Sequence, residues 1–367
     1  IVASYWVACA LQKFEKSSDG STACQGLGGD TCISSGGKDI FDYTVSANGG
    51  LVDIVFVDDN SGSMSSEQNH MAQKFSSFLS QLDARQVDYR IGIITTDISS
   101  SATATTSDDS PNSALHNGNE DSNKQGLLQD GKLVPIETKN SSGAVTGVVG
   151  SYITSSMSNR EQLFKWNISR RETEQCENFL SNYTTSPAPV TEARKNCPSG
   201  DERGIFAANL FLEKNPSSFI RPNAYLAIVV LSDEDERSGM YLDSSNKTYQ
   251  LEDKDKPETL VSQLKQLYAG KSAAVHSIIV KPGDSSCLNS QSGQLSTYTP
   301  VRGSYGQAYA KASQLTGGKI GDICANDYGS QLSTIGADIA ERLSDVTLSC
   351  EDPADLQVEI DPPQVSV

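Results

Sequence analysis

The sequence has few histidines, no Cys-x-x-Cys pair and fewer basic than acidic residues, and each of these features argues against a class of function. The three histidines, His70, His116 and His276, lie in no recognisable catalytic motif, so a hydrolase of the Ser/His/Asp type lacks a candidate base. No Cys-x-x-Cys pair is present, which argues against zinc-ribbon and thioredoxin-like sites. Ile1 to Leu11 is the most apolar end of the chain, but it is far too short to span a bilayer.

The charge of the chain is strongly acidic. Its 367 residues include 29 basic and 46 acidic side chains, which gives a net charge of −17 and a sequence pI near 4.6. A surface of this charge repels nucleic acid and anionic lipid headgroups but is compatible with binding cations. The hydrophobic fraction of 37% is low, and we expect the long Ser, Thr, Asn and Gly stretches to be surface insertions.

The cysteines indicate an oxidising compartment. Eight are present, an even number spaced along polar loops, which is typical of disulfides in secreted, periplasmic or cell-surface proteins. Eight cysteines allow many connectivities, so the pairing we predict is guided by proximity along the chain. Three predicted pairs close polar loops and a fourth ties the ends of the domain together: Cys24–Cys32, Cys176–Cys197, Cys287–Cys324 and Cys9–Cys350.

Cys9 has a second interpretation. The run Trp6-Val7-Ala8-Cys9 has some likeness to a lipoprotein cleavage box, although Trp6 fits it poorly. Lipidation of Cys9 would leave seven cysteines and therefore one without a partner. We favour the disulfide, with a signal peptide preceding this sequence, and keep a lipid anchor as the alternative.

One stretch organises the chain. Ile54 to Val57 is an apolar run long enough for a buried strand, and Met64 to Leu82 has the periodicity of an amphipathic helix. Between them lies Asp59-x-Ser61-x-Ser63, with a glycine at position 62 that we expect to loosen the turn. In an open parallel α/β sheet this turn lies at the carboxyl ends of the strands, where such folds bind their ligands.

The chemistry of this turn predicts a hard cation. Asp59, Ser61 and Ser63 offer only oxygen, without imidazole or thiolate, which suits Mg²⁺ or Ca²⁺, with Mn²⁺ possible, and argues against Zn²⁺ or Cu²⁺. The alternative is an ordinary polar turn in which Ser61 or Ser63 caps the following helix.

Two motifs resemble a known family. The first is Asp59-x-Ser61-x-Ser63 between its strand and its helix, which is similar to the first motif of a von Willebrand factor type A (VWA) domain with its metal-ion-dependent adhesion site. The local sequence is close to that of many bacterial members. Residues 224–231 are an apolar run that leads to Ser232-Asp233, which resembles the last metal motif of the family. The resemblance implies that Asp233 is the distal carboxylate, and Asp235 is the competing candidate.

The third ligand departs from the best-known family pattern. In that pattern, a loop just before a helix donates a threonine hydroxyl to the ion. In this sequence Glu202 occupies the corresponding position, as in a bacterial subgroup. Glu202 would add negative charge and favour a firmly held cation. Its alternative role is a stabilising charge at the helix N-terminus.

Strand and helix patterns alternate along the chain, which predicts an α/β fold with a mostly parallel central sheet covered by helices on both faces. The resemblance implies that this is a Rossmann-like VWA domain. We expect it to span 51–350, with a large irregular insertion at about 98–200, between the second long strand and the Asp233 strand. Within the insertion, 134–136 and 144–149 are candidate short strands and 158–168 a candidate helix. We expect a disulfide-braced lead-in at 1–50, and an extended tail or further β-rich segment at 351–367.

The resemblance implies a binding module rather than an enzyme. A phosphatase of the Asp-x-Asp type needs a second carboxylate two residues beyond its nucleophile. It is not supported, because Asn60 lies two residues beyond Asp58 and Ser61 two residues beyond Asp59. The ion would bridge to a carboxylate offered by a protein or glycan partner, with no role for nucleic acid and a membrane contact only through a lipid anchor. The alternative is a structural module of an envelope or pilus-tip assembly, in which the metal only stabilises the fold.

Overall fold

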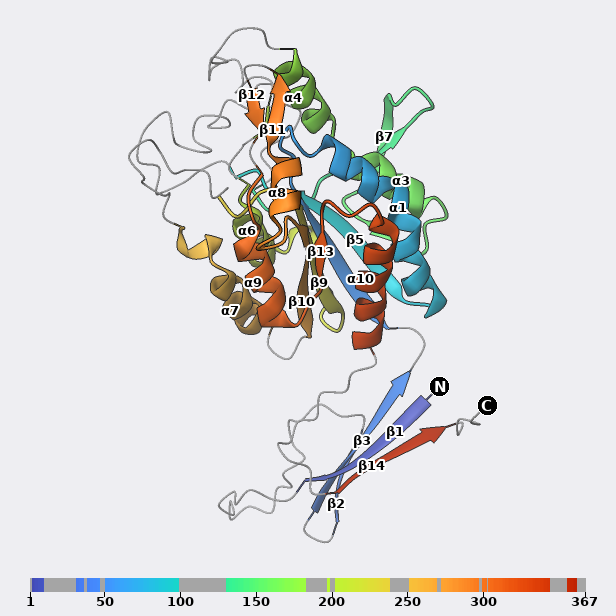
Figure 1. The fold of residues 1–367 in the computed structure, drawn as a ribbon. Coiled ribbons are helices and arrows are strands. Elements are labelled where there is room, and N and C mark those ends of the chain that lie inside the picture. Colours follow the sequence, from blue (N-terminus) through green and yellow to red (C-terminus); the bar gives the residue numbers. More distant parts are fainter. Residues whose placement is uncertain are drawn as a thin grey trace.

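The computed structural model describes residues 2–9, 31–35, 38–46, 50–98, 130–182, 197–198, 202–237, 251–268, 272–296, 299–301, 303–343 and 355–361. At its centre is a six-stranded sheet of order β13-β10-β9-β4-β5-β8 (Figure 1). Five of its strands run parallel, and they are β4 (Leu51–Asp58), β5 (Asp88–Thr95), β9 (Tyr225–Ser232), β10 (Ala273–Ile279) and β13 (Ile320–Asp322). The short edge strand β8 (Ile153–Thr154) is antiparallel to β5.

Helices cover both faces of this sheet, as predicted. One face packs against α1 (Ser65–Ala84), α3 (Arg160–Ile168) and α10 (Tyr328–Arg342). The other packs against α6 (Gly204–Lys214), α7 (Pro257–Leu267) and α9 (Gln307–Thr316). Strand β4 serves both layers, because Ile54 and Phe56 join the first hydrophobic cluster while Val55 and Val57 join the second. The predicted α/β fold class is therefore confirmed.

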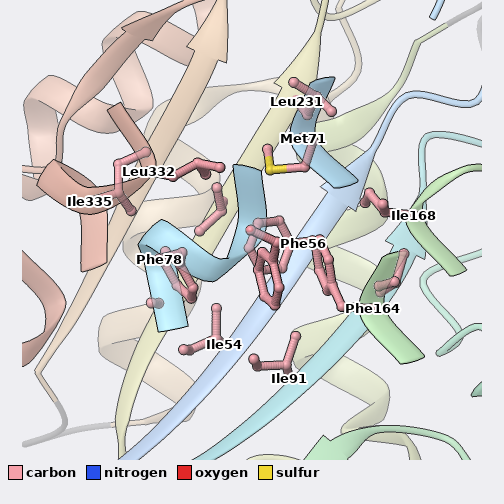
Figure 2. Close-up of a cluster of buried hydrophobic side chains, with 14 of the residues drawn as sticks. Ile54, Phe56, Met71, Phe78, Ile91, Phe164, Ile168, Leu231, Leu332 and Ile335 are labelled. Carbon is pink, nitrogen blue, oxygen red and sulfur yellow. The ribbon is translucent and has the colours of Figure 1, made fainter. Parts of the chain in front are cut away.

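The insertion predicted at 98–200 contributes to the core. Its described part contains the hairpin β6 (Ile136–Lys139) and β7 (Val145–Gly150), the edge strand β8, and helices α3 and α4 (Arg171–Ser181). Phe164 of α3 stacks on Phe75 of α1, with ring centroids 3.4 Å apart, and its ring meets Phe56 edge-on at 4.9 Å (Figure 2). Strand β7 and helix α3 lie close to their predicted ranges, whereas β6 begins only at the last residue of the predicted 134–136 strand. Neither β8 nor α4 was predicted.

A second sheet joins the two ends of the chain. Its order is β14-β1-β3-β2, all antiparallel, and its strands are β1 (Val2–Cys9), β2 (Thr31–Ser35), β3 (Lys38–Ser46) and β14 (Asp355–Asp361). The tail at 351–367, expected to be extended or β-rich, contributes β14. Strand β14 pairs with β1, so the tail and the lead-in at 1–50 share one sheet (Figure 1).

Two of the four predicted disulfides fall within the described residues, and both are confirmed. They join Cys176 to Cys197 and Cys287 to Cys324. Cys287 lies on α8 (Ser285–Gln291), which leads into the hairpin β11 (Gly293–Ser296) and β12 (Thr299–Val301). The predicted pairs Cys24–Cys32 and Cys9–Cys350 involve side chains outside the described part of the structure. Of the helices that the structure describes, none is sufficiently long and apolar to cross a membrane.

Candidate metal centre

The parallel pairing of β4 and β9 brings the two predicted metal motifs together. Asp58 lies opposite Leu231 in the register, so the residues that follow, Asp59 and Asp233, leave the sheet at the same edge. The backbone N–H of Asp59 donates to the carbonyl of Leu231 at 3.0 Å, which joins the two strand ends directly. Segments 170 residues apart in the sequence therefore meet at the carboxyl edge of the sheet, as expected for this fold class.

The Asp59 loop folds back on its own carboxylate. Asp59 is fully buried, and its Oδ1 accepts the backbone N–H of Ser61 at 2.9 Å while its Oδ2 accepts the hydroxyl of Ser232 at 2.7 Å. The hydroxyl oxygens of Ser61 and Ser63 lie 3.1 Å apart. Burial raises the pKa of Asp59, and the hydrogen bonds from Ser232 and Ser61 oppose that rise. One carboxylate and two hydroxyls thus lie together in this loop.

Asp233 is the most unusual group at this edge. Its side chain is fully buried, and neither of its carboxylate oxygens has a well-formed hydrogen bond to any residue that the structure describes. Burial raises the pKa of Asp233 well above its ordinary value, and the charges of Asp59 and Glu67 raise it further, although the nearby Ser63 hydroxyl opposes them. A buried carboxylate without partners is costly unless a cation compensates it.

The competing acidic residues after β9 have other roles. Asp235 accepts the backbone N–H of Ala308 at 2.8 Å, at the start of α9, and burial raises its pKa to about 6. Glu236 accepts the N–H groups of Ile205 and Phe206 at 2.7 and 2.9 Å, at the start of α6. Each of these carboxylates therefore caps the N-terminus of a helix. Asp233 caps neither helix, and its pKa is raised by burial and by the charge of Asp59.

Glu202 is buried in the turn before α6, with a left-handed φ of 40°. Its backbone carbonyl accepts the hydroxyl of Tyr309 at 2.7 Å. Glu236 accepts the N–H groups of Ile205 and Phe206 in the first turn of α6, and the alternative role of Glu202, a charge at the same helix N-terminus, stays a prediction. Ligation of the ion by the Glu202 side chain stays a prediction.

Glu67 is a further acidic residue of this centre, and it was missed in the sequence. It lies in the first turn of α1, is 6% exposed, and accepts a hydrogen bond from Gln291 at 3.1 Å through Oε1. Its other oxygen, Oε2, has no hydrogen-bond partner within the described residues. Glu67 lies in the first turn of the helix that directly follows the Asp59–Ser63 loop. An acidic residue at that place is the signal that could have identified it.

We expect Glu67→Gln to weaken divalent-ion binding about tenfold, equivalent to about 1.4 kcal/mol, because it removes a negative charge close to Asp233 without changing side-chain size. Calorimetric titration with Ca²⁺ measures this. Glu161→Gln on the exposed side of α3 is the control and should bind as tightly as the unchanged protein. An unchanged affinity in Glu67→Gln would place Glu67 outside the electrostatic reach of the ion.

Comparison with known proteins identifies no family: no family model matches the chain, and no curated protein matches it. Among solved structures it has a likeness to the pilus adhesin SpaC from Lactobacillus rhamnosus GG in its open conformation, with 12% identity, a TM-score of 0.30, and coverage of 83% of this chain and 32% of SpaC. A second SpaC structure gives 12% identity, a TM-score of 0.32, and coverage of 83% and 33%. The chain spans about a third of those chains, and a likeness this weak carries no argument about function.

The residues at the carboxyl edge fit a hard divalent cation. Asp59, Ser61, Ser63 and Asp233 offer oxygen alone, and the buried Asp233 carboxylate lacks the partner that a cation would supply. Within the described residues a second potential metal group is formed by Cys287, Asp322 and Cys324. Its two cysteines are joined as a disulfide, so their sulfur atoms are not available as thiolate ligands.

Proposed function

We propose that this chain is a divalent-metal-dependent binding module that resembles a VWA domain and belongs to an extracytoplasmic protein. The observation that carries the proposal is the buried Asp233 carboxylate, which lies without well-formed hydrogen bonds beside Asp59 and Ser63. A structural role alone would favour an apolar or hydrogen-bonded side chain at that place. Two disulfides in the described residues support an oxidising compartment, whether periplasmic, secreted or at the cell surface.

In this proposal Asp59, Ser61, Ser63 and Asp233 hold Mg²⁺, Ca²⁺ or Mn²⁺, with Glu202 as a further candidate. The ion supplies positive charge and an open coordination position, to which a protein or glycan partner donates a carboxylate oxygen. A protein with a net charge of −17 can hold an acidic partner in this way, because the ion offsets the repulsion between them.

We propose no catalytic role for the site. His276, one of the three histidines, is fully buried on β10, where its Nδ1 accepts the backbone N–H of Lys319 at 3.1 Å. Burial lowers the pKa of His276 to about 4, so that it is neutral at physiological pH. His276 is therefore a core histidine of β10 rather than a base beside Ser61 or Ser63.

The test is a calorimetric titration of the protein with Mg²⁺, Ca²⁺ and Mn²⁺. Asp59→Ala should weaken binding of the preferred ion about a hundredfold, because it removes one of the two facing carboxylates. Asp253→Ala, which changes an exposed carboxylate on a distant turn, should bind the ion normally. Equal binding heats for Asp59→Ala and the unchanged protein would contradict the proposal. If chelation melts the fold instead of releasing a bound partner, the structural-assembly alternative is favoured.

A further inference from the structure

Helix α4 lies directly on the loop that carries the candidate metal ligands. A Cβ added to Gly62, between Ser61 and Ser63, would lie 2.7 Å from the sulfur of Cys176 and 3.2 Å from Cδ1 of Leu180, both on α4. The φ of Gly62 is outside the left-handed range, so the turn itself does not require glycine. The structure gives a reason for glycine that the sequence did not show: α4 approaches Gly62 too closely for a side chain to fit without a shift.

Hydrogen bonds join the same helix to the backbone of the loop. Thr173, in the first turn of α4, donates its hydroxyl to the carbonyl of Asn60 at 2.9 Å. Gln68 of α1 donates to the carbonyl of Asp59 at 3.0 Å and to the Thr173 hydroxyl at 3.2 Å. Its Oε1 accepts the backbone N–H of Arg170, just before α4, at 3.0 Å. Thr173 and Gln68 are both buried, so these contacts are shielded from water.

The buried residues of α4 are the ones that contact the loop. Of its 11 residues, only Thr173 and Cys176 are buried. Thr173 is the residue bonded to the loop, and Cys176 is both the residue in contact with Gly62 and one end of the Cys176–Cys197 disulfide. The disulfide and the Thr173 hydrogen bonds therefore act at the two buried positions of α4, which are also the positions that meet the loop. Figure 1 shows α4 at the upper end of the molecule, close to β11.

We propose that α4 is a positioning element of the metal centre. The Cys176–Cys197 disulfide holds α4 in contact with the Asp59–Ser63 loop, and this contact keeps the loop in its ion-binding conformation. The inference rests on the proposed function, since it assigns to α4 the control of that same site. It adds that the affinity for the ion depends on a disulfide none of whose atoms is an ion ligand.

The test is a double-mutant cycle with Mn²⁺ affinity as the measurement. Gly62→Ala should weaken Mn²⁺ binding about tenfold or more in the disulfide-bonded protein, because its Cβ would overlap the Cys176 sulfur. In a Cys176→Ala/Cys197→Ala background, which lacks that sulfur, the same change should weaken binding less than about twofold. In a Cys287→Ala/Cys324→Ala background the full effect of Gly62→Ala should persist.

Thr173→Val supplies a second variant that leaves both disulfides intact. It removes the hydroxyl bonded to Asn60 while keeping the side-chain shape, and should weaken Mn²⁺ binding by about threefold to tenfold. Thr334→Val, on the exposed side of α10, is the matched control and should bind Mn²⁺ normally. If the double-cysteine variant fails to fold, the Thr173 and Thr334 pair decides the proposal.

The outcomes separate this inference from the proposed function. If the unchanged protein binds no Mn²⁺, Mg²⁺ or Ca²⁺, both fail. If the unchanged protein binds an ion but Gly62→Ala has the same effect with and without the Cys176–Cys197 disulfide, α4 does not position the loop and only this inference is overturned. An unaltered affinity in Thr173→Val overturns it as well.

Discussion

Asp233→Asn is expected to abolish divalent-ion binding and, in ion-free buffer, to raise the free energy of unfolding by about 1–3 kcal/mol. The two effects have one cause. The Asp233 carboxylate is fully buried without well-formed hydrogen bonds, and the charges of Asp59 and Glu67 add repulsion. Replacing it with a neutral side chain of the same shape relieves that cost, but removes the charge that the ion requires.

Urea unfolding in the presence of a chelator measures the stability change, and calorimetry measures the loss of ion binding. The matched control is Asp235→Ala, two positions along the same acidic run. Asp235 holds the Ala308 N–H at the start of α9, so its loss should cost about 1 kcal/mol instead. We therefore expect the free energy of unfolding to rise in Asp233→Asn and to fall in Asp235→Ala. A decrease in stability in Asp233→Asn would show that the carboxylate has a stabilising partner and needs no ion.

The second large effect, on the free energy of unfolding, is expected when a buried ion pair is broken. Asp255→Ala should lower the free energy of unfolding by about 3–5 kcal/mol, because it breaks a fully buried pair with Arg203 at 2.8 Å. Arg237 lies 3.9 Å from the same carboxylate. Arg203 directly follows Glu202 in the sequence, and Arg237 directly follows Glu236. Removing Asp255 leaves positive charge in the interior with less compensation.

Urea unfolding monitored by fluorescence measures this change. Asp253→Ala is the control, since it removes a carboxylate from the same turn, Asp253–Asp255, but from an exposed pair with Lys256. It should leave the unfolding midpoint unchanged. If the two variants unfold at the same urea concentration, the buried Arg203–Asp255 pair contributes no more than a surface pair.

Much of the central fold was predictable from local patterns. The runs Ile54–Val57 and 224–231 are continuously apolar because β4 and β9 are buried on both faces of the sheet. Helices α1, α7 and α10 follow apolar spacing that is visible in the sequence. The pairing of β1 with β14 was not predictable, since it joins segments from opposite ends of the chain and no local pattern specifies a partner.

Part of the candidate site was likewise predictable from the sequence, and part was not. Asp59, Ser61, Ser63 and Asp233 were found because each follows the end of a recognisable strand, and parallel strands end at one edge of the sheet. The capping roles of Asp235 and Glu236 depend on which helices begin opposite them, which only the folded chain shows. The role of α4 was hidden for the same reason, because Gly62 and Cys176 are distant in the sequence.

The most direct test of the central claim is the anomalous scattering of Mn²⁺ in a crystal of this protein. We predict one strong peak among the oxygens of Asp59, Ser61, Ser63 and Asp233, at the carboxyl edge of the parallel sheet. A crystal soaked in saturating Mn²⁺ that shows no peak there, or a peak only on exposed carboxylates elsewhere, would contradict the metal-dependent binding function.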